Sequence, residues 1–248
     1  MSLRVDLNAD LGEGAGHDEE LMALISSASI ACGYHAGDAE TMAQTLALAR
    51  RHGVAVGAHP SFRDREGFGR RELDLPPEET RETVLAQLEI FAAAARAAGV
   101  EPRHVKPHGA LYNLAARERK TADAVVQAVL AHDAALRLYA PCRSELARAA
   151  AEHGLRVAHE FFADRHYQAN GALVPRGQPE ALLRDPAEAA ERLIRALRAG
   201  KVAAVDGVEI GMEIDTVCLH GDSAEAVPIA KAIRAALQRA GVVMAPPG

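Results

Sequence analysis

One local pattern recurs along this chain and limits the folds that it can form: a short apolar stretch, a polar turn that carries histidine, and then a helix. In the most pronounced example, residues 29–32 run into a turn with His35 and Asp38, and an alanine- and leucine-rich segment follows from Ala39. The turn is typical of a strand end, and Asp38 is placed to cap the helix. Strands that alternate with helices in this way predict a parallel sheet with right-handed crossovers.

We expect about seven such strands, most of them followed by a helix. The expected strands cover residues 3–7, 29–32, 54–58, 104–108, 136–140, 155–162 and 216–219. The expected helices cover residues 18–26, 39–52, 76–98, 117–132, 144–153 and 186–199, and a last helix is capped by Ser223. Residues 202–214 predict a hairpin about Asp206-Gly207, and residues 245–248 predict a frayed tail. We therefore predict an α/β fold, a single irregular β/α barrel domain over residues 1–248, with an open doubly wound sheet as the structural alternative.

Composition and charge exclude several classes of protein. Aromatic residues make up 4% of the chain and tryptophan is absent, which argues against a carbohydrate-binding platform of stacked rings. The net charge is −6 with both signs mixed along the chain, so nothing favours nucleic-acid or membrane binding. No apolar run approaches the roughly 20 residues that a membrane span needs. Because a strand begins by Leu3, we expect no secretory leader. The three cysteines are odd in number and far apart, so we expect reduced thiols and a cytoplasmic location.

In a β/α barrel, polar residues that follow the strands gather at one end, where such folds place their active sites. The side chains collected by this rule are Asp6, Asn8, Asp10, Glu13, His35, Asp38, His59, Lys106, His108, Glu160, Asp164, Arg165, His220 and Asp222. A packed core does not require histidines at several strand ends, so together they favour a shared functional site. Taken singly, Asp38 can serve only as a helix cap and His59 as a buried structural histidine. Glu160 and Asp164 can likewise form a structural network with Arg165.

Several well-known motifs are absent from the sequence. It has no phosphate-binding loop of the form Gly-x-x-x-x-Gly-Lys-Ser/Thr, and residues 12–17 lack the third glycine of the dinucleotide fingerprint. It also has no Gly-x-Ser-x-Gly elbow and no paired Cys-x-x-Cys motif. Histidines together with carboxylates suit zinc or manganese, but no compact signature such as His-Glu-x-x-His is present. We therefore assign no metal ligands from the sequence, and the binding of a divalent metal stays open.

Several motifs in a fixed order give the chain a resemblance to a known family. They are residues 6–13 (DLNADLGE), 30–38 (IACGYHAGD), 57–61 (GAHPS), 67–71 (GFGRR), 106–113 (KPHGALYN), 162–165 (FADR) and 220–222 (HGD). On these motifs, which extend over nearly the whole chain, it resembles the LamB/YcsF family, although Ser29 stands where the family usually has asparagine. The resemblance implies a barrel similar to that of polysaccharide deacetylases.

The same resemblance implies an enzyme, a hydrolase that acts on a cyclic amide. The implied reaction is the 5-oxoprolinase reaction, the ATP-dependent opening of 5-oxo-L-proline (pyroglutamate) to L-glutamate. It implies two partner subunits, B and C. The absence of a phosphate-binding loop from this chain agrees with ATP being bound partly or wholly by those partners.

The implied reaction needs particular chemical groups. A lactam is a resonance-stabilised amide, and phosphorylation of its carbonyl oxygen would create a good leaving group. The chain would then supply a base to activate water, cations for the phosphate and carboxylate, and an acid for the ring nitrogen. The predicted catalytic residues are Asp10 as the base, Glu13 assisting it, and His35, His59 and His108. The predicted substrate-binding residues are Asn8, Asp38, Arg70, Lys106, Asp164, Arg165 and His220, of which Lys106 and Arg70 would bind anions.

Two other functions stay open at this point. A metal-dependent amide or ester hydrolase of the deacetylase type would use Asp10, His35 and His59 as metal ligands. A non-catalytic lactam-binding or regulatory subunit would bind the lactam and perform no chemistry. In either case the charged, glycine-bearing loop over residues 61–71 could close over the site.

Overall fold

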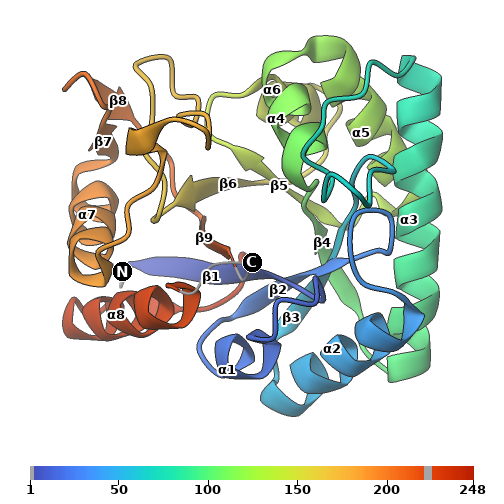
Figure 1. Cartoon of the computed structure of the whole chain (residues 1–248), viewed down its shortest axis with the longest axis horizontal. Helices are drawn as coiled ribbons and strands as arrows, with labels where there is room; N and C mark the ends of the chain where they lie inside the picture. The colour runs from blue at the N-terminus through green and yellow to red at the C-terminus, as the bar shows by residue number, and fades with distance from the viewer. Residues whose placement is uncertain (1–2, 221–224) are drawn as a thin grey trace.

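Seven parallel strands close into a barrel in the computed structural model, which describes residues 3–220 and 225–248 (Figure 1). The barrel strands are β1 (Arg4–Leu11), β2 (Ser27–Ala31), β3 (Ala55–His59), β4 (Pro102–Val105), β5 (Arg137–Pro141), β6 (Val157–Phe162) and β9 (Thr216–His220). They pair in that order, and β9 closes the barrel because it pairs in parallel with both β6 and β1. The prediction of a β/α barrel is confirmed, and the open doubly wound sheet is excluded.

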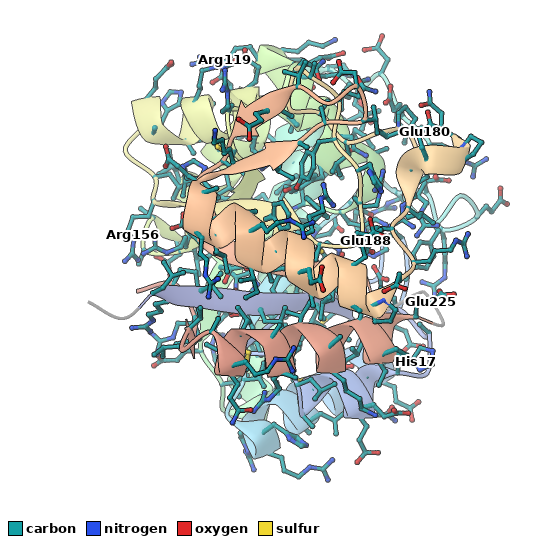
Figure 2. All side chains as sticks on the ribbon, turned by 90° about the vertical axis from the view of Figure 1, so that its left-hand side faces the viewer. His17, Arg119, Arg156, Glu180, Glu188 and Glu225 are labelled. Carbon is teal, nitrogen blue, oxygen red and sulfur yellow. The ribbon has the colours of Figure 1, made fainter. Side chains whose placement is uncertain are left out.

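Helices surround the barrel on its outer side (Figure 1). They are α1 (Asp18–Met22), α2 (Ala39–His52), α3 (Pro77–Ala98), α4 (Gly109–Arg117), α5 (Arg119–Asp133), α6 (Glu145–Glu152), α7 (Pro186–Ala199) and α8 (Ala226–Arg239). Figure 2 shows α7 and α8 side by side on one flank, with Glu188 of α7 and Glu225 ahead of α8 lying toward the same side. Among the described residues, we find no helix that combines the length and the hydropathy of a bilayer-spanning segment.

Local sequence signals determine several helix ends, as predicted. Asp38 and Ser144 cap α2 and α6, each by accepting a hydrogen bond from a backbone N–H of the first turn. Gly53 ends α2 with φ 68°, a left-handed conformation that costs little when the residue has no Cβ. The predicted cap at Ser223 lies outside the described residues.

The barrel interior is polar, and this explains the most important difference from the expected elements. We predicted a strand over residues 3–7 and then a polar turn, but β1 continues to Leu11. Its polar residues Asp6, Asn8 and Asp10 contact partners across the barrel, whereas the apolar residues between them belong to the hydrophobic core. Since a strand presents alternate residues to its two faces, a polar interior produces an alternation of acids and aliphatic residues. The prediction of a turn was wrong because it took this alternation for the end of the strand.

Other segments differ from the prediction at their ends. Helix α4 begins at Gly109, shortly after β4, although we expected no helix between residues 98 and 117. Strand β10 (Val243–Met244), which was not predicted, lies just before the predicted tail and pairs in parallel with β1. Helix α1 ends at Met22, short of the expected residue 26. The hairpin is confirmed, with β7 (Lys201–Ala203) antiparallel to β8 (Glu209–Gly211).

Candidate active site

Four side chains meet at the end of the barrel to which the strands run: Glu13, His35, His59 and His108, here called the mouth cluster. His59 is the last residue of β3, and the other three follow β1, β2 and β4 within a few residues. One nitrogen or oxygen atom of each lies within 4.8 Å of those of the other three. The imidazoles are buried, and the Glu13 side chain is 3% exposed. The structure therefore brings together four of the five residues predicted to be catalytic, and the fifth, Asp10, lies beside them.

Polar atoms approach closely within this cluster. Glu13 Oε1 lies 3.1 Å from His35 Nε2 and 3.2 Å from His108 Nδ1. His59 Nε2 lies 3.0 Å from His108 Nδ1 and 3.5 Å from Asp10 Oδ2. The rings of His35 and His108 stack with centroids 3.8 Å apart. Burial alone would raise the pKa of Glu13, but the neighbouring imidazoles of His108 and His35 outweigh burial and hold the pKa of that carboxyl well below its usual range.

Backbone carbonyls orient two of the imidazoles. His59 Nδ1 lies 2.7 Å from the carbonyl oxygen of Lys106, and His108 Nε2 lies 2.9 Å from that of Phe68. A carbonyl oxygen only accepts hydrogen bonds, so we assign a proton to both of these ring nitrogens. Each ring is thereby held with its other nitrogen turned toward the mouth cluster.

The loop over residues 61–71 forms one wall of the mouth cluster. The ring of Phe68 meets the rings of His35 and His108 edge-on, at centroid distances of 5.7 and 5.5 Å. Phe68 has φ 56°, which residues other than glycine rarely adopt, and Gly69 follows with φ 65°. A Cβ on Gly69 would lie 2.9 Å from side-chain atoms of both His35 and His108, so the close approach of the loop requires glycine. The loop is thus packed against the site, and its closing motion stays a prediction.

A buried lysine lies beneath the mouth cluster. Lys106 Nζ lies 2.8 Å from Asp10 Oδ1 and 2.8 Å from Glu160 Oε1, and it donates to Asn8 Oδ1 at 3.1 Å. Glu160 also accepts a hydrogen bond from the Tyr112 hydroxyl at 2.7 Å. Burial alone would lower the pKa of Lys106, but the neighbouring carboxylates raise it well above its usual value, so the ammonium stays charged. These five residues are called the lysine network below.

A pocket of about 590 Å³ opens over the mouth cluster and the lysine network. The predicted site residues that line it are Asp10, Glu13, His59, Arg70, Lys106, His108 and Arg165. Arg143 and Arg176 also line the pocket. Arg143 has φ 65°, a strained conformation for an L side chain of the kind that clusters at ligand sites. Because several cations face this cavity, it is suited to an anionic ligand.

The remaining predicted site residues lie elsewhere. His35 and Asn8 are buried beneath the pocket surface and contact Glu13 and Lys106. Asp38 is exposed, caps α2 and does not line the pocket. Asp164 is buried next to the lining residue Arg165 without lining the pocket itself. His220 ends β9, but its side chain lies outside the described part of the structure.

Of the alternative structural network that joins Glu160 and Asp164 to Arg165, the part that involves Glu160 is not formed. Glu160 belongs to the lysine network, whereas Arg165 donates to the backbone carbonyls of Val174 and Ala181. Burial and the neighbouring Arg176 lower the pKa of Arg165 to about 10. Arg165 thus lies in the pocket wall, fixed by backbone acceptors.

Sequence reasoning gave no role in the site to Tyr112, Phe68 or Arg143. Tyr112 lies on α4, which was not predicted. Arg143 directly follows β5, so the rule that polar residues follow barrel strands would have found it. Phe68 contributes its carbonyl group and an unusual φ, and no pattern of side chains reveals either.

A second polar cluster lies inside the barrel toward the end where the strands begin. Asp6 accepts hydrogen bonds from the hydroxyls of Thr216 (2.6 Å), Ser26 (2.7 Å), Ser27 (2.8 Å) and Tyr139 (3.0 Å). These five residues are called the base cluster below. Its members are not among the residues that line the pocket.

The fold and the site together define a class of protein: a β/α barrel with a polar interior and a carboxylate–histidine site where its strands end. The barrel resembles the catalytic domain of peptidoglycan N-acetylglucosamine deacetylase from Eubacterium rectale, with a TM-score of 0.54 and 11% identity over 99% of this chain and 89% of that one. At that identity the likeness concerns the fold alone. The chain belongs to the LamB/YcsF family, whose model matches residues 5–248.

Two relatives match the chain over nearly its full length. The A subunit of 5-oxoprolinase from Methylococcus capsulatus is 50% identical over 250 residues, which are 99% of this chain and 96% of the relative. The crystal structure of a lactam utilization protein from Thermus thermophilus has 46% identity and a TM-score of 0.92, and the match covers 98% of this chain and 99% of that one. The family membership that the sequence motifs indicated is therefore confirmed.

Proposed function

We propose that this chain is the A component of a 5-oxoprolinase and takes part, with partner subunits B and C, in the ATP-dependent opening of 5-oxo-L-proline to L-glutamate. One observation carries the proposal. A carboxylate–histidine cluster lies at the floor of a cation-lined pocket, in a chain that is 50% identical over nearly its full length to the A component of a known 5-oxoprolinase. The substrate combines a carboxylate with a ring amide, and the pocket offers groups that suit both.

Asp10 is the proposed base that activates water. Its carboxylate lines the pocket, 2.8 Å from Lys106 Nζ and 3.5 Å from His59 Nε2. Glu13, whose Oε1 lies 3.8 Å from His59 Nε2, would assist. His108, which also lines the pocket, would orient the attacking water.

The cations of the pocket would bind the charged parts of the substrate. Lys106 is held between two carboxylates, so it orients Asp10 and contributes positive charge at the floor. Arg70 and Arg143 line the pocket farther out, where a substrate carboxylate or a phosphate on the lactam oxygen would be held. A pocket of about 590 Å³ is larger than the lactam needs, which leaves room for a phosphorylated form.

This chain would bind a lactam whose phosphorylation by ATP depends on subunits B and C. The sequence has no phosphate-binding loop of the common type, and we therefore assign the binding of ATP mainly to subunits B and C. Phosphorylation of the lactam oxygen transfers the terminal phosphoryl group of ATP to that oxygen. Attack of one water on the carbon that bears this phosphate breaks its bond to the ring nitrogen, to which the proton taken from water passes. A second water then cleaves the resulting acyl phosphate and releases phosphate and L-glutamate.

The test is a reconstitution. ATP hydrolysis and glutamate release are measured with 5-oxo-L-proline, using this chain alone, candidate B and C subunits alone, and the complete mixture. We expect glutamate and phosphate only from the complete mixture, and Asp10→Asn in this chain should abolish glutamate release. The absence of product from the complete mixture would overturn the proposal, and unchanged glutamate release by a folded Asp10→Asn variant would reduce the chain to a binding component.

A further inference from the structure

The protons of the mouth cluster can be counted from its backbone contacts. His59 Nδ1 and His108 Nε2 both donate to carbonyl oxygens, at 2.7 and 2.9 Å. In a neutral imidazole only one nitrogen carries a proton. His59 Nε2 and His108 Nδ1 are therefore lone-pair atoms in the neutral rings, and they face each other at 3.0 Å.

The groups beside these two nitrogens are carboxylates, which also only accept. Glu13 Oε1 lies 3.2 Å from His108 Nδ1 and 3.8 Å from His59 Nε2, and Asp10 Oδ2 lies 3.5 Å from the latter. Lone pairs and negative oxygens that converge in a buried space repel one another unless a positive charge lies between them. The arrangement thus requires a cation, which is either an extra proton or a metal ion.

The distances favour a metal ion of the zinc class. Zinc binds histidine nitrogen and carboxylate oxygen at about 2.0–2.2 Å, which places tetrahedral ligand atoms about 3.3–3.5 Å apart. The three separations among His59 Nε2, His108 Nδ1 and Glu13 Oε1 are 3.0, 3.2 and 3.8 Å. A metal-binding histidine usually donates its other N–H to a carbonyl or carboxylate, as both of these rings do.

We propose that His59 Nε2, His108 Nδ1 and a carboxylate oxygen of Glu13 form a binding site for one divalent transition-metal ion such as Zn²⁺. All three residues line the pocket, so the remaining coordination positions face it. Such an ion, when bound, supplies a Lewis acid and acidifies a water ligand. The site differs from the ligand set considered from the sequence, because Glu13 and His108 replace Asp10 and His35.

His35 lies outside the ligand set and acts on Glu13. Its Nε2 lies 3.1 Å from Glu13 Oε1, a hydrogen-bond distance. Its Nδ1 is buried and has no hydrogen-bond partner among the described residues, so it lacks the carbonyl contact that supports the other two rings. His35 is therefore a positioning residue for Glu13.

Metal binding by the purified full-length chain tests the proposal without substrate, ATP or partners, so its outcome is independent of the proposed function. The metal-free protein, prepared with a chelator, is titrated with Co²⁺ while its visible absorption is recorded, and bound Zn²⁺ is counted after equilibrium dialysis. We expect one ion per chain and an absorption typical of low coordination number. The protein should also melt at a higher temperature in the presence of Zn²⁺.

The variants discriminate between ligands and neighbours. His59→Gln, His108→Gln and Glu13→Gln should each weaken binding by more than about 100-fold, whereas loss of a supporting contact, as in His35→Gln, should cost about 10- to 100-fold. His104→Gln is the matched control, because His104 is an equally buried histidine toward the other end of the barrel. The metal affinity of this variant should stay within about twofold of that of the wild type. Circular dichroism of each metal-free variant checks its fold.

Two results would overturn the metal site. One is a wild-type chain that binds Co²⁺ and Zn²⁺ no better than a folded His59→Gln/His108→Gln double variant, which would assign the charge between the rings to a proton. The other is unchanged binding in folded Glu13→Gln and His108→Gln variants.

Discussion

The mouth cluster and the base cluster lie toward opposite ends of one barrel and each contains a buried carboxyl group, but their hydrogen bonds are arranged in opposite ways. In the base cluster, four hydroxyls donate to the single carboxyl group of Asp6. In the mouth cluster, the carboxylate of Glu13 and two imidazole lone pairs converge on one another. The base cluster is satisfied by the protein alone, whereas we propose that a bound metal ion completes the mouth cluster.

This difference separates stability from function inside one polar interior. Buried polar groups that satisfy each other contribute to a unique fold, and their loss destabilises the protein. Groups that face one another as acceptors cost stability and are retained where binding or catalysis uses them. We therefore expect substitutions at the mouth to reduce activity with little effect on unfolding, and substitutions toward the base to do the reverse.

Within the mouth cluster, the largest effect is expected for Glu13→Gln. This substitution keeps the shape of the side chain but removes its charge and proton affinity, so turnover of the reconstituted enzyme should fall by about 10³-fold. The free energy of unfolding should change by no more than about 1 kcal/mol, because the amide oxygen of glutamine can keep the hydrogen bond with His35 Nε2. Steady-state kinetics with B and C and urea unfolding of the isolated chain measure the two quantities. Glu20→Gln on the exposed face of α1 is the control. If Glu13→Gln lost activity only because less of the protein was folded, the proposed difference between the mouth cluster and the base cluster would be wrong.

Lys106→Met should cause the largest loss of stability. Removal of the ammonium leaves Asp10 and Glu160 as buried negative charges without their cation, which typically costs about 3–5 kcal/mol. Lys201→Met is the matched control, because Lys201 pairs with Glu209 at the surface, where a pair contributes about 0–1 kcal/mol. Urea unfolding of both variants is compared with the wild type. An equal decrease in the free energy of unfolding of the two variants would show that the lysine network does not stabilise the barrel.

A pH experiment tests the region of the base cluster. His104 stacks on Tyr139 with centroids 4.1 Å apart, its Nε2 lies 3.1 Å from Ser29 Oγ, and burial lowers its pKa from 6.5 to about 3. Because the folded pKa is depressed, the neutral ring stabilises the protein above pH 6.5, and this contribution is lost as the pH falls toward 3. The slope reaches about 1.4 kcal/mol per pH unit for one proton.

Urea unfolding from pH 7 to pH 4 checks this slope. His104→Gln should flatten it, and the turnover per folded enzyme at pH 7 should stay within about twofold of the wild type. His153→Gln, on a more exposed histidine that ends α6, serves as the control and should leave the slope unchanged. If the free energy of unfolding of wild type and His104→Gln had the same dependence on pH, the loss of stability in acid would come from another titratable group.

Much of this organisation follows from short-range signals in the sequence. The cap at Asp38, the stop at Gly53 and the alternation of strands and helices predicted the barrel, because they depend on neighbouring residues. The convergence of Glu13 and His108 followed from the rule that strand ends meet at one end of a barrel. Partners across the barrel could not be predicted, since their distances depend on the register of strands far apart in the chain.

For Asp38 the sequence predicted two roles, a helix cap and a substrate-binding residue, and the structure shows the cap. The motif predicted substrate binding, whereas the structure shows an exposed carboxylate that accepts hydrogen bonds from the Thr41 backbone N–H at 2.8 Å and hydroxyl at 2.9 Å. Those two contacts hold the pKa of Asp38 below its usual value, as expected for a cap at the positive end of a helix.

Asp38→Ala should therefore lower the melting temperature by about 2–4 °C, the typical effect of losing an N-cap in a chain of this size. The matched control is Ser144→Ala, which removes the corresponding cap of α6 and should lower the melting temperature by a similar amount. Turnover and the KM for 5-oxo-L-proline, measured well below the melting temperature, should remain within about twofold of the wild type in both variants. An increase in KM confined to Asp38→Ala would return this residue to the binding site and would extend the site from the mouth of the barrel to the first turn of α2.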